Sequence, residues 1–326
     1  MKNLKVGVIG VGYLGRFHAQ KYAALEGVDL VGVADVNSIQ AQQVAAECAC
    51  KSFTDYKDLL AVVDAVSIVV PTSHHHQVAG DCLDAGIDVL LEKPMTVTLQ
   101  EANDLIAKAE QNQLILQIGH LERFNPAVQA MEPFLTTPVF IESNRIATFK
   151  NRGVDVDVVL DLMIHDIDII LNIVKSPIKT IHTVGAPVAT KTTDIANARL
   201  IFENGATANV TVSRISRTNV RKMRIFQPGS YINVDFGNKK VMTIQLSEEL
   251  LDSGMPKQVV ELRSFADGDA LRSEITSFVQ HVRDRTRPAV SGVEGQRALA
   301  VALQVMEQIK EHQKLDLFKN FFHPKT

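Results

Sequence analysis

The stretch LKVGVIGVGYLG, residues 4–15, decides how this chain folds. Its first half is a short apolar run typical of a buried strand, and its second half places glycines at positions 10, 12 and 15 ahead of a helical segment. In a dinucleotide-binding turn the first glycine allows the tight turn, the second lets a diphosphate approach the backbone, and the third lets the helix pack against the strand. We therefore predict that a helix N-terminus binds a dinucleotide cofactor through Gly10, Gly12, Tyr13, Leu14 and Gly15.

A carboxylate at the end of the second strand favours NAD over NADP. Residues 28–34 (VDLVGVA) form another apolar run that ends at Asp35, twenty residues after Gly15, where this fold needs an acceptor for the ribose 2′-hydroxyl. Between Asp35 and Lys51 there is no arginine or lysine to attract a 2′-phosphate. The alternative is an aspartate that only ends a strand at the surface. We expect Asp35 to bind the ribose and the cofactor to be NAD.

Strand-like and helical segments alternate through the first third of the chain. The apolar runs are 65–70, 88–91 and 114–118, and the helical segments are 38–48, 55–60, 73–85 and 98–111. This alternation predicts an α/β Rossmann fold with a doubly wound parallel sheet. Ligands bind beyond the carboxyl ends of such strands, so the cofactor cleft should hold Pro71, Thr72, Glu92, Lys93 and His120.

The pattern changes after Leu121. Seven strand-like segments follow the one at 139–147, and the helical segments are 126–134, 156–174, 271–285 and 294–312. A run of strands between helices predicts an α+β domain with a large, mostly antiparallel open sheet. We expect an NAD-binding domain over residues 1–121 and a substrate-binding and oligomerisation domain over residues 122–326.

Composition excludes several classes of function. The 326 residues carry a net charge of −3, so the chain has no general attraction to nucleic acid or acidic membranes. No apolar run reaches the roughly 18 residues that a membrane span needs. The first strand leaves no room for a signal peptide, and three cysteines form neither a disulfide framework nor a zinc pattern. We expect a cytoplasmic protein.

Two sets of polar residues are candidates for chemistry. Lys93 follows a buried strand, and its ammonium could stabilise a developing alkoxide; a surface lysine is the alternative. Asp161, His165 and Asp168 are spaced to share one face of an otherwise apolar helix, where a histidine flanked by carboxylates could act as acid or base. A buried structural histidine is the alternative there. We expect no metal at this stripe, nor at the consecutive histidines 74–76, which point in different directions on a helix.

These motifs together resemble the glucose–fructose oxidoreductase, inositol dehydrogenase and rhizopine catabolism (Gfo/Idh/MocA) family over nearly the whole chain. The motifs are the glycine turn with His18, Pro71-Thr72 with His75, Glu92-Lys93-Pro94, and Asp161 with His165 and Asp168. The resemblance implies an NAD(P)-dependent sugar or polyol oxidoreductase that uses the lysine and the histidine as catalytic residues, with Asp161 beside them. It adds His75 to the cofactor site. Met163 stands where the family often has glycine, which leaves the substrate open.

The segment GHLERFNPA, residues 119–127, resembles one subgroup of that family. This subgroup oxidises UDP-N-acetylhexosamines, such as UDP-N-acetylglucosamine, at C3. The resemblance implies that Arg123 and Asn125 join Lys93, Asp161, His165 and Asp168 in binding a nucleotide-linked sugar.

Other functions remain open. Within the enzymes, the alternatives are a dehydrogenase of a free sugar or polyol and a reductase of an imine or linear tetrapyrrole. Outside them, a non-catalytic NAD-binding sensor would need the glycine turn and Asp35, but neither Lys93 nor the stripe of acid and base groups.

Two further expectations concern the second domain. Five cations lie within eleven residues, and some could bind a diphosphate; solvated strand edges are the alternative. They are Arg214, Arg217, Arg221, Lys222 and Arg224. The domain also has more sheet than its helices can cover, so we expect a homodimer or homotetramer that buries the uncovered face.

Overall fold

The computed structural model describes residues 3–149 and 156–315, and the chain divides into two compact units. The first unit comprises residues 1–124 and 269–299, and the second comprises residues 125–268 and 300–326. This division differs from the expected domains 1–121 and 122–326 mainly in one segment, residues 269–299. That segment contains helix α8 (Ala270–Asp284), whose Ile275 and Phe278 are buried in the core of the first unit.

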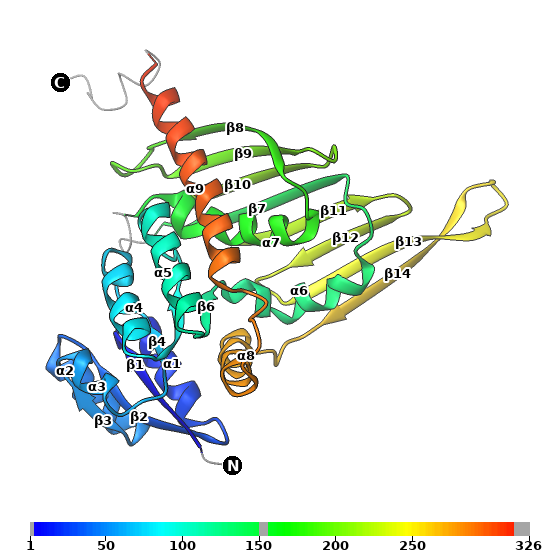
Figure 1. The fold of residues 1–326 in the computed structure, drawn as a ribbon. Coiled ribbons are helices and arrows are strands. Elements are labelled where there is room, and N and C mark those ends of the chain that lie inside the picture. The colour runs from blue at the N-terminus through cyan, green and yellow to red at the C-terminus, as the bar shows by residue number, and fades with distance from the viewer. Residues whose placement is uncertain (1–2, 150–155, 316–326) are drawn as a thin grey trace. The chain divides into compact units, whose positions relative to one another are not determined.

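The first unit is built on a parallel six-stranded sheet with the order β3-β2-β1-β4-β5-β6, coloured blue to cyan in Figure 1. Its strands are β1 (Leu4–Ile9), β2 (Val28–Ala34), β3 (Lys51–Phe53), β4 (Ala65–Ile68), β5 (Asp88–Glu92) and β6 (Leu116–Gly119). Its helices are α1 (Tyr13–Ala23), α2 (Ser38–Cys48), α3 (Tyr56–Leu60), η1 (Thr72–His74), α4 (His75–Asp84), α5 (Leu99–Gln111), η2 (Leu121–Phe124), α8 and the start of α9 (Gly292–Gln313). The predicted Rossmann sheet is therefore confirmed.

The strand order reverses between β1 and β4, which is where such a sheet opens a crevice for a ligand. Both strands are buried along the sheet, and α1 packs on them: its Tyr22 is fully buried and shares a 2.8 Å hydrogen bond with Ser67 on β4. Strand β3 was not predicted, because its three residues include only one apolar side chain.

The second unit is built on an eight-stranded sheet with the order β14-β13-β12-β11-β7-β10-β9-β8. The strands are β7 (Phe140–Thr148), β8 (Ile178–Ala186), β9 (Ile195–Phe202), β10 (Thr207–Ser216), β11 (Val220–Gln227), β12 (Ser230–Asp235), β13 (Lys240–Leu250) and β14 (Pro256–Ser264). Only the β7–β10 pair is parallel, so the predicted mostly antiparallel open sheet is confirmed.

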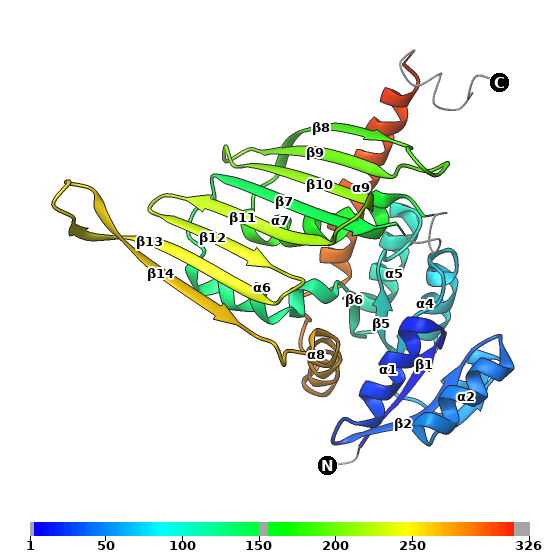
Figure 2. The same ribbon diagram turned by 180° about the vertical axis from the view of Figure 1, so that it is seen from behind.

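Helices of the second unit lie on one face of this sheet, in front of it in Figure 1 and behind it in Figure 2. They are α6 (Pro126–Met131), η3 (Glu132–Phe134), η4 (Val159–Met163), α7 (Ile164–Val174) and the end of α9. Side chains that alternate along the strands are buried toward these helices. On the opposite face Phe226 contacts both Phe140 and Tyr231, with ring centroids 5.8 and 5.0 Å apart, and remains 36% exposed.

Among the described residues, no helix combines the length and the apolar character that crossing a bilayer requires.

Candidate active site

The glycine turn has the geometry that the sequence predicted for it. Gly10 adopts a φ of +83°, which favours glycine, and a Cβ there would lie 2.6 Å from the carbonyl oxygen of Val69. A Cβ at Gly15 would lie 1.8 Å from the carbonyl oxygen of Gly10, so α1 packs directly on the turn. A Cβ at Gly12, by contrast, would meet no atom within 4 Å.

The start of α1 is open to an anion. Gly12 is the N-cap of the helix and offers no side-chain acceptor to the first N–H groups. Tyr13 and Leu14 in the first turn are 63% and 49% exposed. A helix N-terminus with exposed first-turn side chains, beside open space at Gly12, fits the diphosphate of a dinucleotide.

Asp35 lies beside this turn at the end of β2. Its Oδ2 accepts a 2.9 Å hydrogen bond from the backbone N–H of Val11, and its Oδ1 accepts one of 2.9 Å from Asn37. Two apolar neighbours that the sequence analysis did not single out, Val36 and Ile39, are 96% and 76% exposed. These side chains form an exposed apolar surface next to the carboxylate that we expect to bind the ribose, and only the coordinates reveal that exposure.

His75 links the ends of two strands. It is buried on α4, with Nε2 2.9 Å from the carbonyl oxygen of Val70 and Nδ1 2.9 Å from that of Pro94. Burial lowers the pKa of its imidazole, so it is neutral near pH 7 and its one N–H donates to one of these two carbonyl oxygens. His75 thus fixes the segment that holds Pro71 and Thr72 against the segment that follows Lys93.

Glu92 and Lys93 stand at the carboxyl end of β5. The Glu92 Oε2 accepts a 3.2 Å hydrogen bond from the backbone N–H of Lys93, and its Oε1 lies 3.3 Å from Nε2 of His18 on α1. Burial acts to raise the pKa of Glu92, but the His18 hydrogen bond and the charge of Lys93 bring it below its usual value. Glu92 is therefore an anion that holds the Lys93 backbone.

His120 follows β6 and is buried, with its backbone N–H bonded to the carbonyl of Ile118 at 2.8 Å. Gly119 precedes it, and a Cβ at Gly119 would lie 3.1 Å from both Cα and Cδ of Glu92. Glycine at position 119 thus lets the end of β6 pack closely against Glu92.

In the second unit the predicted polar stripe begins in a π-helical turn, which the sequence did not indicate. The turn, η4, contains Asp161, whose backbone N–H bonds to the carbonyl of Asp157 at 3.0 Å. Asp161 is exposed, His165 on α7 is half-buried and Asp168 is buried, so the stripe runs from the surface inward. Short π-helical turns are frequent at functional sites, and this one marks the stripe independently of its residue types.

A buried ion pair that the sequence analysis missed anchors α7. Asp166 accepts hydrogen bonds from Nε and Nη2 of Arg145 on β7, at 3.0 and 2.9 Å, and both side chains are at most 3% exposed. Arg145 also lies over the ring of Phe236, 5.3 Å from its centroid. Bidentate pairing satisfies both charges, so Asp166 holds the helix while its neighbour His165 stays accessible.

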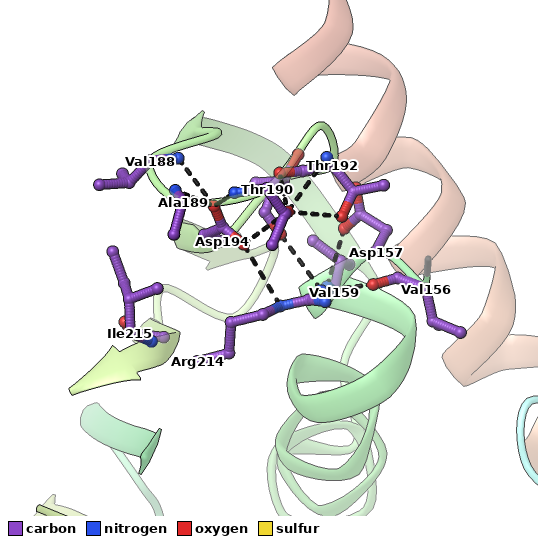
Figure 3. Close-up of polar contacts among 12 residues, drawn as sticks. Val156, Asp157, Val159, Val188, Ala189, Thr190, Thr192, Asp194, Arg214 and Ile215 are labelled. Carbon is purple, nitrogen blue, oxygen red and sulfur yellow. Dashed lines mark hydrogen bonds and ion pairs between the residues drawn. The ribbon is translucent and has the colours of Figure 1, made fainter. Parts of the chain in front are cut away.

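Arg214 and Asp194 hold the segment that precedes η4, as Figure 3 shows. The Asp194 Oδ2 accepts three backbone N–H bonds from residues 188–190, which hold the pKa of this carboxyl below its usual value against its burial. The Arg214 guanidinium lies 3.7 Å from Asp194 and donates to the carbonyl oxygens of Val156 and Thr193. Asp157 in turn caps Val159 at 2.9 Å, so this network orders the start of the π turn.

The structure places Asn125 and Arg123, both expected to bind the substrate, in different surroundings. The Asn125 side chain is buried and caps α6, accepting from the N–H of Ala127 at 3.1 Å and donating to the carbonyl of Phe236 at 3.1 Å. Arg123 lies half-buried on η2. Asn125 therefore stabilises the fold of the second unit through these two hydrogen bonds.

The five cations of residues 214–224 do not form one cluster. Arg214 is buried in the network described above, Lys222 lies 3.5 Å from Asp235, and Arg224 pairs with Glu142. Arg217 and Arg221 are exposed. Successive side chains along a strand point to opposite faces of the sheet. Three of the five cations also have acidic partners. Both observations disfavour a shared diphosphate site here.

Among residues 3–149 and 156–315, no group of three or more histidine, cysteine or acidic side chains is arranged to hold a metal ion. In the histidine run 74–76, His75 contacts backbone carbonyls, whereas His76 lies 2.8 Å from Asp104.

Comparison with known proteins decides the family. The profile described as "Oxidoreductase family, NAD-binding Rossmann fold" matches residues 4–120, and the Gfo/Idh/MocA C-terminal domain matches residues 142–227. The chain belongs to the Gfo/Idh/MocA family of oxidoreductases. It is therefore an NAD-dependent dehydrogenase, as the glycine turn and Asp35 predicted.

Relatives include the UDP-N-acetylglucosamine 3-dehydrogenase of Acidithiobacillus ferrooxidans, which is 42% identical over 94% of this chain and 97% of its own length. The myo-inositol 2-dehydrogenase of Thermotoga maritima is 23% identical over 96% and 98%. The solved structure of the Acidithiobacillus enzyme superposes with a TM-score of 0.88, at 40% identity, over 95% of this chain and 99% of that one. A levoglucosan dehydrogenase bound to NADH and levoglucosan, at 16% identity and a TM-score of 0.83, shares the fold.

The position of Asp35 predicts how cofactor choice changes. Asp35→Asn keeps an oxygen that can accept from Val11 but removes the charge that repels a 2′-phosphate. We expect the ratio of NADP to NAD affinity to rise roughly tenfold or more. Titration calorimetry with both cofactors measures this, with Asp29→Asn on the same strand as the control. Tighter binding of NADP than of NAD to the unaltered protein would contradict the assignment.

Proposed function

We propose that this enzyme oxidises the 3-hydroxyl of a UDP-linked N-acetylhexosamine, UDP-N-acetylglucosamine above all, with NAD as the hydride acceptor. The observation that carries the proposal is the 42% identity to a UDP-N-acetylglucosamine 3-dehydrogenase over almost the whole of both chains. A match restricted to the Rossmann unit would support only the identity of the cofactor, not that of the substrate. This one includes the second unit, which we expect to bind the substrate.

The residues of the first unit fit NAD. The open space at Gly12 and the uncapped start of α1 would hold the diphosphate, and Asp35 would accept from the ribose. Pro71, Thr72 and His120, at the ends of β4 and β6, would border the nicotinamide, with His75 and Glu92 fixing their surroundings. NAD bound there would supply the acceptor for the hydride that leaves the sugar carbon.

Lys93 and His165 would have different roles at the substrate hydroxyl that is oxidised. We assign His165 as the base that takes the hydroxyl proton, because imidazole is the side chain that most often transfers protons in catalysis. We assign Lys93 as the donor that stabilises negative charge on the same oxygen. Asp161 would orient His165, and Asp168 and Arg123 would border the sugar.

These assignments predict the behaviour of two alanine variants. Lys93→Ala and His165→Ala should each lower kcat by roughly a hundredfold or more, the size expected of electrostatic and acid–base contributions. NAD affinity should persist in His165→Ala. Steady-state kinetics and NAD titration measure both, with Lys57→Ala and His182→Ala as controls at exposed positions. Near-normal turnover in both variants would show that the chemistry lies elsewhere.

The substrate is tested by following NADH formation with a panel of sugars. We expect kcat/KM for UDP-N-acetylglucosamine to exceed that for free N-acetylglucosamine or myo-inositol by about a hundredfold or more, since the nucleotide supplies most of the binding contacts. UDP alone should compete with the substrate. Equal oxidation of free sugars, or no competition by UDP, would exclude a nucleotide-sugar enzyme.

The uncovered face of the second unit supports a homodimer or a homotetramer. Phe140, Phe226 and Tyr231 form an aromatic group there, and a symmetric pair of such faces would bury it. We expect sedimentation to give a mass of two or four chains. Phe226→Asp should lower that mass, whereas Phe149→Asp, outside the aromatic group, should not. A monomer at working concentration would contradict this.

A further inference from the structure

Glu274 is a buried carboxyl that the proposed mechanism does not use. It lies on α8, its side chain is 0% exposed, and neither carboxylate oxygen has a hydrogen-bond partner among the residues that the structure describes. Gln117 on β6 donates to its backbone carbonyl at 3.3 Å, and the Gln117 Oε1 is also buried without a described partner. A carboxylate in such a place would carry an unsatisfied buried charge, which is strongly unfavourable.

A second carboxyl, Glu92, lies near enough for its charge to act on Glu274, but it is bonded quite differently. It is 15% exposed, one of its oxygens faces His18 and the other accepts the Lys93 backbone N–H. The backbone of Gly119 packs closely against it, since a Cβ at that position would approach Glu92 Cδ to 3.1 Å. Donors that favour the charged form therefore converge on Glu92, and none of the described residues donates to the side-chain carboxyl of Glu274.

Two carboxyls so placed do not both ionise, and their bonding decides which one keeps the proton. Burial, and next the negative charge of Glu92, raise the pKa of Glu274 well above its ordinary value. The contacts of Glu92 have the opposite effect on its own pKa. The pair is thus asymmetric, with a neutral Glu274 and an anionic Glu92.

We propose that Glu274 is a positioning residue that stays protonated, so that Glu92 is the one buried anion of this pair and its charge fixes the backbone of Lys93. The inference rests on the proposed function insofar as Lys93 acts on the substrate. An ionised Glu274 would repel the Glu92 carboxylate and disturb its contacts with Lys93 and His18. The neutral acid removes that repulsion while it fills the space between α8 and the sheet.

Other groups around Glu274 complete its electrostatic surroundings. Helix α1 supplies His18 and Tyr22, and burial raises the pKa of the Tyr22 hydroxyl, which keeps it neutral. The segment η2, which packs against α8, carries Glu122 and Arg123. Of these groups and Glu92, only Glu92 acts appreciably on the pKa of Glu274.

The first test is the pH dependence of stability, which needs no substrate. The folded state retains a proton on Glu274 that the unfolded state loses as pH rises through its ordinary pKa, so the unaltered protein loses stability with rising pH relative to Glu274→Gln. The quantity to follow is the difference in Tm, the value for the Gln variant minus the value for the unaltered protein. We expect this difference to be larger at pH 8 than at pH 5 by about 3 °C or more. The control Glu26→Gln, at an exposed position, should give a constant difference.

A Tm difference for Glu274→Gln that does not change with pH would overturn the proposal. Failure of that variant to fold would also overturn it, because an amide reproduces the neutral acid. Glu274→Met provides a second neutral side chain of similar size, and its Tm difference should increase with pH in the same way.

The second test separates positioning from a purely structural role. Ionisation of Glu274 as the pH rises should lower kcat/KM for the UDP-sugar, and this fall should be absent in Glu274→Gln. We expect the ratio of kcat/KM at pH 9 to that at pH 7.5 to be at least about threefold higher in the Gln variant. An unchanged ratio, with the Tm result as expected, would leave Glu274 a protonated structural residue and overturn its positioning role. If no UDP-sugar is oxidised at all, the proposed function fails while the Tm test of the protonated state still stands.

Discussion

The close approach of α1 to the turn that precedes it is the constraint on which the first unit depends. With glycine at position 15, the helix lies against the carbonyl of Gly10, where any side chain would collide. That approach places His18, one turn along α1, beside Glu92 at the end of β5. It also places Tyr22, one turn further, against Ser67 on β4. One short contact thus sets both the position of the N-terminal end of α1 and the partner of the carboxylate next to Lys93.

In the second unit, buried charges perform the same task for the helix that carries His165. Arg145 holds Asp166 from one side, and the network of Arg214 and Asp194 holds the segment before the π turn. Burying such charges is unfavourable unless each is well paired, and breaking a buried pair typically costs about 3–5 kcal/mol. The number of hydrogen bonds made by Asp194 and Asp166 accounts for their tolerance of burial. A functional helix anchored at both its start and its middle has little freedom to shift.

Sequence reasoning predicted the parallel sheet, the glycine turn, Asp35 and the antiparallel second sheet, because each depends on local patterns of spacing and composition. It missed what depends on contacts distant in sequence. The pairing of Arg145 with Asp166 and the assignment of α8 to the first unit have no local pattern. The π turn has the same apolar spacing as an α-helix, so Asp161 could not be placed in it. The cations of β10 and β11 looked like one cluster, because their acidic partners lie far away along the chain.

The discontinuity of the first unit has a consequence for biosynthesis. Helix α8 completes that unit, but residues 125–268 must be translated before it, which takes roughly 7–30 s at roughly 5–20 residues per second. During that interval the surface that α8 later covers, including Tyr22 on α1, is exposed on the nascent chain. Folding of the Rossmann sheet on the ribosome can therefore begin early, but it ends only after the whole of the second sheet has been synthesised.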